Sequence, residues 1–314
     1  MTPAVMPAEN AGAVRLRGCV VLAVSALALV LAGCLDRAPR IPIVPQGQPL
    51  ALDDARVVRV LGSLDALADA RGALTGSARV ALTGPDFKLN RPQRIALARP
   101  GRLRFEILAL FDQLAAILVT DGLDYGFFDA SSGDVSRGRV SSTLLWNLTK
   151  IDLTPAELVG LLLAAPRPEA GTLRAGAWLE PSGRLAIAFA WPPASIAAAC
   201  ADVGPLGAST PPSCFLAERA TLEGGGQLFF FDATDELAEV RGLDVGGVIR
   251  YRVRFEEYEA IGVEDEPRFP KRVTLESPAN ASEARFQWKR VRFAPGLADD
   301  VFRLPEPMRS ASAR

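Results

Sequence analysis

The chain has 314 residues, 49% of them hydrophobic, and carries 35 basic and 36 acidic residues but no histidine. The formal net charge of −1 gives no indication of the basic face that a nucleic-acid partner requires. Without histidine, Ser/His/Asp and Cys/His catalytic triads are excluded, as are histidine-bearing metal sites. We therefore expect a protein that is not an enzyme and needs no cofactor or metal, with ample apolar residues for a globular core.

The N-terminal segment has the order of a secretory signal. Two arginines precede an apolar stretch, Val20–Gly33, which is shorter than the roughly 20 residues that a membrane-spanning helix needs. The sequence LAGC ending at Cys34 resembles the lipobox of bacterial lipoproteins, whose cysteine is lipidated and becomes the first residue of the mature chain. We predict a signal peptide over 1–33 and a lipid anchor on Cys34. The alternative is an ordinary signal cut elsewhere, with a chance cysteine.

The residues after Cys34 indicate which membrane holds the anchor and how the folded domain is joined to it. In enteric bacteria an aspartate directly after the lipidated cysteine favours inner-membrane retention, whereas this chain has Leu35 there. We therefore expect an anchor in the outer membrane, facing the periplasm. Residues 34–51 contain four prolines, a spacing that favours an extended polyproline II tether. The alternative is a segment that packs along the folded domain.

We expect the folded domain over 52–307, followed by a short tail over 308–314. Asp53 can cap a helix whose apolar residues recur at spacings of three and four, as at Val57, Val60 and Leu64. Gly72 follows the last apolar position of this pattern and is expected to end the helix.

From there to about residue 130 the apolar period changes to two, which is typical of strands. Leu103, Phe105 and Ile107 alternate with charged neighbours, and the run LAAILVT is apolar on both faces, as in a covered strand. Asp121-Gly122 is a tight-turn signal before the aromatic strand DYGFFD. This part of the sequence predicts an antiparallel meander.

Two helices are expected next. The first is short and lies within 141–148. The second begins at Thr154-Pro155-Ala156-Glu157, where a threonine cap, a proline at the first helical position and a capping-box glutamate occur together. Its leucines continue an apolar face as far as Pro166.

After the second helix the strand pattern resumes. The strands are expected at 173–180, 184–190, 227–232, 236–242, 247–259, 269–276 and 283–293. Between them, Cys200 and Cys214 flank a Pro/Gly/Ser-rich segment. Since an exported protein with an even pair of cysteines favours a disulfide, we predict a Cys200–Cys214 bridge. The alternative is a pair of free or metal-binding thiols, although two thiols without histidine make a poor zinc site.

This order of elements resembles the LolA/LolB family of bacterial lipoprotein-localisation factors. The resemblance is carried by GRLRFEILALFDQLAAILVTDG, by IDLTPAELVGLLLAAP and by the closing DDVFRLPEP. It implies a mainly β fold with α (α+β), an incomplete antiparallel β-barrel with helices covering the concave face. It further implies an apolar cavity there that takes lipid acyl chains. The anchor on Cys34 argues against the soluble shuttle role of LolA.

The alternating strands supply candidates for the lining of such a cavity. They are Phe105, Ile107, Leu118, Ile249, Tyr251, Val253 and Phe255. The alternative is that these residues form an ordinary core beneath the helices. Many-stranded curved sheets can do either, because their inner face is sometimes left partly unfilled.

In LolB proteins a leucine on an exposed loop after the third strand helps to pass lipoproteins to the membrane. The resemblance places Leu110 at that position, with Phe111 beside it, although Pro-Leu-Gly has become Ala-Leu-Phe here. These two residues are the candidates for a transfer loop. The departure favours the alternative that they bury themselves.

Two functions of different class remain open. The first is a membrane-anchored factor that binds lipid acyl chains or lipoproteins in its cavity, without chemistry. The second is a structural or assembly lipoprotein of the cell envelope, with a filled core, that binds protein partners which the sequence does not identify.

Overall fold

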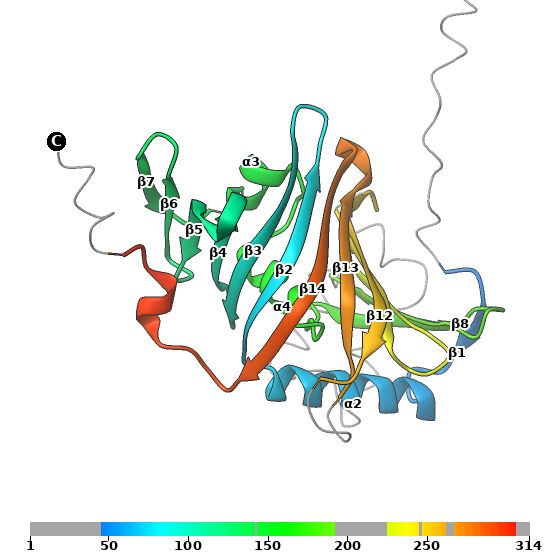
Figure 1. Ribbon diagram of the computed structural model, residues 1–314. Coiled ribbons are helices and arrows are strands. Elements are labelled where there is room, and N and C mark those ends of the chain that lie inside the picture. Colours follow the sequence, from blue (N-terminus) through cyan, green and yellow to red (C-terminus); the bar gives the residue numbers. More distant parts are fainter. Residues whose placement is uncertain (1–44, 142, 192–224, 245–246, 262–266, 306–314) are drawn as a thin grey trace, which may run out of the picture. The chain divides into compact units, whose positions relative to one another are not determined.

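The computed structural model describes residues 45–141, 143–191, 225–244, 247–261 and 267–305 (Figure 1). The predicted signal peptide, the lipidation site Cys34, the predicted Cys200–Cys214 bridge and the tail over 308–314 lie outside the described residues. Within the described ranges, no helix has the length and apolar character needed to cross a membrane.

Strands dominate the described chain. In order they are β1 (Gln48–Leu50), β2 (Ala73–Thr83), β3 (Lys88–Ala98), β4 (Arg102–Leu108), β5 (Leu114–Thr120), β6 (Asp124–Asp129), β7 (Val135–Arg139), β8 (Leu173–Leu179), β9 (Leu185–Ala190), β10 (Gly226–Phe231), β11 (Leu237–Leu243), β12 (Ile249–Glu259), β13 (Phe269–Ser277) and β14 (Ser282–Ala294). The helices are α2 (Ala55–Ala70), α3 (Leu144–Thr149) and α4 (Pro155–Leu162), with 3₁₀ turns η1 (Leu110–Asp112), η4 (Pro278–Asn280) and η5 (Asp299–Phe302). Every helix and strand range predicted from the sequence contains its observed element to within a few residues.

All fourteen strands form one antiparallel sheet in the order β1-β8-β9-β10-β11-β12-β13-β14-β2-β3-β4-β5-β6-β7. The last strand, β14, pairs with β2 from Glu283↔Thr83 to Ala294↔Ala73, which joins the two halves of the meander. The strands at the two ends of this order, β1 and β7, are not paired with each other in the described chain, so the sheet stays open. The predicted fold class, an incomplete antiparallel barrel with helices, is confirmed.

The predicted tether ends earlier than expected. Gln48–Leu50 form β1, which pairs with β8 from Gln48↔Leu179 to Leu50↔Ala177. Pro49 is tolerated because β1 is an edge strand, where one side of the backbone has no ladder partner to supply. The sheet therefore begins at Gln48, inside the range predicted as the 34–51 tether.

Helix α2 is capped by Asp54, one residue later than predicted. The Asp54 side chain accepts hydrogen bonds from the backbone N–H groups of Arg56 and Val57. The helix buries the predicted apolar positions, and Figure 1 shows it running across one end of the strands. Arg56 fixes its first turn there by donating to the carbonyls of Gly183 and Asp232, at 3.0 and 2.7 Å.

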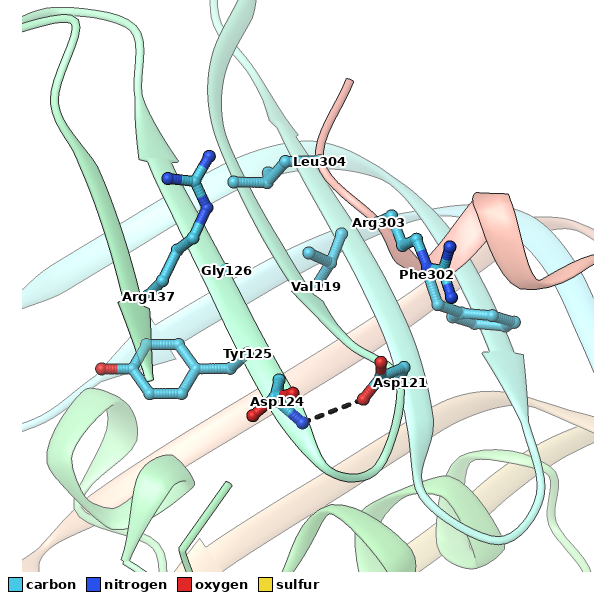
Figure 2. Close-up of a pocket in the computed structure, with 9 residues that line it drawn as sticks. All are labelled: Val119, Asp121, Asp124, Tyr125, Gly126, Arg137, Phe302, Arg303 and Leu304. Atoms are coloured by element: carbon cyan, nitrogen blue, oxygen red, sulfur yellow. Dashed lines mark hydrogen bonds between the residues drawn. The ribbon is translucent and has the colours of Figure 1, made fainter. Parts of the chain in front are cut away.

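The C-terminal segment explains why β5 is apolar on both faces. After β14 the chain crosses the convex side of the sheet, where Leu304 packs with Ile117 and Val119 of β5. We call this segment, residues 295–305, the strap. Arg104 holds the strap by donating to the carbonyls of Val301 and Arg303, both at 3.1 Å. Figure 2 shows the strap beside β5 and β6, enclosing a shallow pocket of about 190 Å³. The convex face of β5 is thus a second, small core.

Candidate functional site: an apolar cavity beneath a short helix

The concave face of the sheet is divided into two regions by the helices that cover it. One region, here called the filled region, lies beneath α4 and includes the inner faces of β11 and β12. The other, here called the cavity region, lies beneath α3 and the loop that joins α3 to α4. The two regions share one apolar cluster but differ in how completely side chains fill it.

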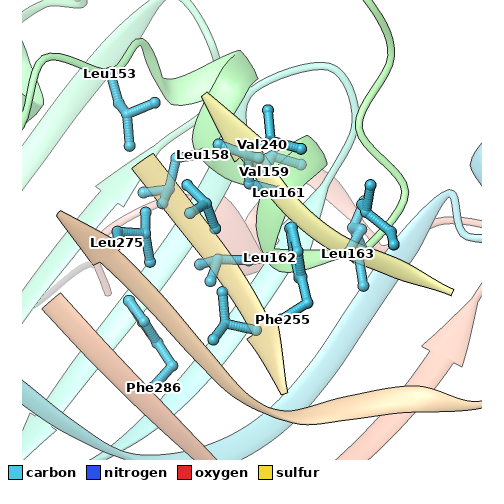
Figure 3. Packing of buried hydrophobic residues seen from close by; sticks show 14 of the residues in the cluster. Leu153, Leu158, Val159, Leu161, Leu162, Leu163, Val240, Phe255, Leu275 and Phe286 are labelled. Atoms are coloured by element: carbon cyan, nitrogen blue, oxygen red, sulfur yellow. The ribbon is translucent and has the colours of Figure 1, made fainter. Parts of the chain in front are cut away.

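In the filled region, side-chain hydrogen bonds fix the N-terminus of α4. The Thr154 side chain accepts from the Glu157 backbone N–H at 3.2 Å, while a Glu157 carboxylate oxygen accepts from the Thr154 backbone N–H at 2.8 Å. This is the predicted capping box, and it is confirmed. Leu161 and Leu162 are fully buried, and Figure 3 shows the leucines of α4 among side chains of the sheet, including Phe255.

The other end of α4 is held by a buried arginine. Arg71, just after α2, donates to the carbonyls of Leu163 and Ala164 and to those of Pro267 and Arg268. Burial lowers the pKa of Arg71 to about 10, which still leaves the guanidinium charged at neutral pH. Its positive charge lies against the free carbonyls at the end of α4, where the helix dipole favours a cation.

A second arginine holds the start of α4 to β12. Arg250 Nη2 lies 2.6 Å from a Glu157 oxygen and 3.1 Å from a Glu169 oxygen. Burial, followed by the nearby Glu157 carboxylate, raises the pKa of Glu169 to about 7. Beside this cluster, Gln227 donates to the hydroxyl of the buried Tyr251 at 2.9 Å. These groups form the polar part of a cleft of about 650 Å³, which is also lined by Leu161 and Trp191.

The cavity region is covered less completely. Helix α3 has six residues and no side-chain cap at Thr143, so little local structure fixes its start. Beneath it lies a cavity of about 190 Å³. Its lining is almost wholly apolar: Val80, Leu82, Gln93, Phe105, Ile107, Leu118, Phe127, Leu145, Leu148, Thr149, Ile151, Leu153, Leu158, Leu275, Ala284 and Phe286.

The predicted lining residues fall into two groups. Phe105, Ile107 and Leu118, on β4 and β5, line the cavity beneath α3. The four from β12, namely Ile249, Tyr251, Val253 and Phe255, are buried elsewhere, and Tyr251 also borders the cleft beside α4. The reason for this difference is α4, whose leucines occupy the concave side over β12.

The candidate transfer residues are fully presented to solvent. Leu110 is 70% exposed and Phe111 is 93% exposed, on the turn between β4 and β5. The interpretation that they bury themselves is wrong. Phe111 has φ of 58°, a left-handed conformation that costs a residue with a side chain about 1–2 kcal/mol. Asp112 is also left-handed, with φ of 56°, so two successive left-handed residues form this turn.

The register places this turn at the same end of the sheet as the cavity. Ile107, which lines the cavity, pairs with Ala116 only one residue before the strands part at the turn. Leu82 and Ala284, also lining residues, pair with each other next to the ends of β2 and β14. Leu148, at the cavity's edge on α3, is 42% exposed. Exposed apolar side chains therefore lie at the end of the sheet where the cavity lies.

Sequence reasoning missed the lining residues on α3, β13 and β14, which are six of the sixteen. Leu275 and Phe286 were signalled by alternation in their strands, as clearly as Phe105 was. Leu145 and Leu148 of α3 had no comparable signal, because a six-residue helix is too short for its buried face to show a period.

The fold and site define a class: an open antiparallel half-barrel whose helix-covered concave face keeps a small apolar cavity. Among the described residues, no group of three or more acidic or thiol side chains is placed to hold a metal ion. No protein-family model and no curated protein sequence matches the chain.

Solved structures similar to the chain include members of the superfamily that the sequence resembles. A LolA superfamily protein from Nitrosomonas europaea is 13% identical, with a TM-score of 0.43 over 77% of this chain and 97% of that one. A DUF1329 family protein from Desulfovibrio piger is 14% identical, with a TM-score of 0.48 over 78% of this chain and 95% of that one. A domain from Vibrio parahaemolyticus assigned to outer membrane lipoprotein sorting is 11% identical, with a TM-score of 0.45 over 78% and 95%.

Proposed function

We propose that this protein is a lipid-anchored envelope protein that binds acyl chains of lipids or lipoproteins in the cavity beneath α3, without catalysing a reaction. Cys34 would carry the anchor, in the outer membrane facing the periplasm. The role would be the handling of lipoproteins on their way to that membrane. The observation that carries the proposal is the cavity itself, a space beneath α3 whose lining is almost wholly apolar.

The lining suits a hydrocarbon chain and little else. Two of the sixteen lining residues, Gln93 and Thr149, carry polar side-chain groups, and none carries a charge. A cavity with so few polar partners does not stabilise ordered water, so an apolar guest meets little competition for it. An apolar chain that enters exchanges water for aliphatic and aromatic contacts, at about 0.8 kcal/mol for each CH₂ buried.

The size of the cavity implies that α3 moves when a chain binds. A volume of about 190 Å³ lies below the roughly 300–1,000 Å³ of ordinary ligand pockets. Helix α3 is the cover best suited to move, because it is short and lacks a side-chain cap. Its displacement would join the cavity to solvent at the exposed Leu148.

The exposed turn would act at the membrane. Leu110 and Phe111 project from the sheet end at which the cavity lies. Two large apolar side chains held out in water are costly unless they meet another apolar phase. Insertion of this turn into a bilayer would bring the cavity close to the lipid that it releases or receives.

The first experiment asks what the cavity holds. The chain from residue 36 to 314 would be exported behind a cleavable signal, purified without detergent and extracted for mass spectrometry. Stoichiometric phospholipid or acylated peptide, absent from an unrelated periplasmic protein and reduced in Ile107→Trp, supports acyl binding. The matched control, Val58→Trp, adds the same ring to an exposed position of α2 and should retain the lipid.

A clean extract from well-folded protein would instead favour the structural or assembly role. The filled region beneath α4 is what supports that alternative, because over β12 the concave face has the character of an ordinary core.

The second experiment tests the turn. Leu110→Glu should leave the free energy of unfolding within about 0.5 kcal/mol of the wild type, because the side chain is exposed. Transfer of bound lipid or lipoprotein to vesicles should fall severalfold. Leu123→Glu is the control, since Leu123 is 64% exposed on the turn at the opposite end of β5. Normal transfer by Leu110→Glu would show that the turn has no such role.

A further inference from the structure

A second site lies on the convex side of the sheet, away from the cavity. The pairing of β13 with β14 ends at Arg272↔Gln287, whereas β14 continues beside β2 as far as Ala294↔Ala73. Figure 1 shows β14 diverging from β13 toward α2. A groove of about 600 Å³ begins at this gap and extends over β14 to β2 and β3. We call it the seam groove.

The seam groove is strongly cationic. Its lining includes Arg94, Lys271, Lys289, Arg290 and Arg292, against one carboxylate, Glu259. That carboxylate is already paired with Lys271, at 3.2 Å. Arg94 reaches Glu106 only at 3.7 Å and stays largely exposed. Even with Glu106 counted, five positive charges against two negative charges leave a local excess that an anion would neutralise.

The strand register places two of these arginines around a small residue. Ser77 of β2 is directly opposite Arg290 on one side and Arg94 on the other. Directly opposed residues on neighbouring strands have Cβ atoms about 4.5–5.5 Å apart. The short Ser77 side chain therefore leaves room between two long guanidinium side chains that rise from the same face. Two guanidinium groups on either side of one anion can each offer paired N–H donors.

A bulge in β14 creates this arrangement. The register with β2 shifts between Trp288 and Arg290, so Lys289 is the extra residue. The shift returns Arg290 and Arg292 to the face of Ser77 and Thr75. Gly76 permits it, because a Cβ at that position would lie 2.4 Å from the Arg290 carbonyl oxygen. Bulges commonly re-aim side chains next to functional sites.

The groove is bounded on its inner side by the apolar core. Trp288 lines the groove, is only 2% exposed and packs in that core with Phe286, and its indole Nε1 has no hydrogen-bond partner among the described residues. Leaving a buried donor unsatisfied costs about 1–3 kcal/mol. Along the same stretch, the β14 backbone has no strand on its β13 side within the described chain, and this open edge borders the gap on the side of β14 away from Ser77.

We propose that the seam groove is a phosphate-recognition site, in which Arg94 and Arg290 bind the phosphate group across Ser77. Phosphate is favoured over a carboxylate because a phosphate group has about three acceptor oxygens and can take paired donors from both guanidinium groups, whereas one guanidinium group already occupies both oxygens of a carboxylate. The group could be presented on an anionic phospholipid head group or as a free phosphate compound. This site is separate from the acyl cavity and does not depend on the function proposed for it.

The test titrates the full chain, purified in a non-ionic detergent, with two probes by calorimetry. The probes are inorganic pyrophosphate and a short-chain phosphatidylglycerol. Replacing both arginines in Arg94→Gln/Arg290→Gln should weaken binding about 100-fold, from about tenfold for each charged donor lost. The matched control is Lys88→Gln/Arg139→Gln, which removes two exposed cations from β3 and β7 outside the groove and should change affinity less than about threefold.

Ser77→Glu provides a second variant. It places a carboxylate between Arg94 and Arg290, so it should abolish binding while leaving the melting temperature unchanged or raised. If the groove variants lose binding of both probes, the result supports recognition of the phosphate group itself. Loss of phosphatidylglycerol alone, with no pyrophosphate binding, supports a lipid head group. The proposal would be overturned if the wild type bound neither probe. It would also be overturned if the groove variants and the control variant lost affinity equally.

Discussion

The concave face carries two helices of similar length whose surroundings differ sharply. Helix α4 has a complete capping box at its start, Arg250 beside that start and Arg71 at its end. Helix α3 has no side-chain cap at its start, and it ends at Lys150, a left-handed C-cap whose backbone N–H donates to the Trp146 carbonyl. Beneath α4 the sheet is filled, whereas beneath α3 an apolar cavity remains.

The difference teaches how one sheet can supply both a core and a binding space. A helix that is fixed at both ends can deliver leucines to defined positions on the sheet, as α4 does. A helix held by two buried leucines, Leu144 and Leu145, covers the sheet without filling it. With the proposed acyl binding, stability and ligand access fall to neighbouring regions of the same face.

The largest expected effect compares one leucine from each helix. Leu162→Ala should lower the free energy of unfolding by about 3–5 kcal/mol, because Leu162 is surrounded on all sides and leaves a new void. Leu145→Ala should cost about 2 kcal/mol, since Leu145 already borders open space and loses fewer contacts. Urea unfolding monitored by circular dichroism measures both.

Addition of a fatty acid sharpens the same comparison. A ligand that binds only the folded protein raises its stability, so the fatty acid should raise the midpoint of Leu145→Ala at least as much as that of the wild type. Equal costs for the two leucines, with no effect of the fatty acid, would mean that the two regions are filled alike.

The second prediction concerns pH and the start of α4. The folded-state pKa of Glu169 is raised from 4.5 to about 7, so the folded protein holds this proton more tightly than the unfolded chain does. Stability contributed by the protonated form is therefore lost as pH rises from about 4.5 to about 7. Because the group is partly solvated, we expect a loss of about 1 kcal/mol across this range.

Glu169→Gln should flatten that pH dependence, measured as the urea midpoint between pH 4 and pH 8. The control is Glu256→Gln, which removes a carboxylate from the less buried face of β12. This variant should leave the slope as in the wild type. A Glu169→Gln slope that matches the wild type would show that this carboxylate does not titrate with folding in that range.

Much of this comparison could be predicted from the sequence, for physical reasons that differ between elements. The capping box of α4 is local, so Thr154, Pro155 and Glu157 announce it without knowledge of the fold. The alternation in β12 is equally local and correctly separates buried from exposed residues. The side chains that pack on β12 come from α4, which is distant in the sequence. The sequence pattern of β12 alone therefore could not decide whether its buried face lines a core or a cavity.

The exposed turn shows the same limit. Two adjacent large apolar residues in a sequence favour burial, since exposure of such residues is usually costly. Only the left-handed backbone at Phe111 and Asp112 turns the pair outward, and nothing in the residues themselves requires that conformation. The bulge at Lys289 is comparable, because it depends on the pairing of β14 with β2.

The smallest expected effect separates strain from function at that turn. Phe111→Gly should raise the free energy of unfolding by about 0.5 kcal/mol, because glycine relieves the left-handed backbone and an exposed ring forfeits almost no contacts. Phe111→Ala keeps the strained backbone and should show no gain.

Both variants should bind vesicles less well than the wild type, measured by co-sedimentation, because both lack the apolar ring. A gain in stability with unchanged vesicle binding would mean that the ring serves no purpose at a membrane. Reduced vesicle binding in both variants, with a stability gain only in the glycine variant, would show that the chain retains a strained residue for the sake of the surface it presents.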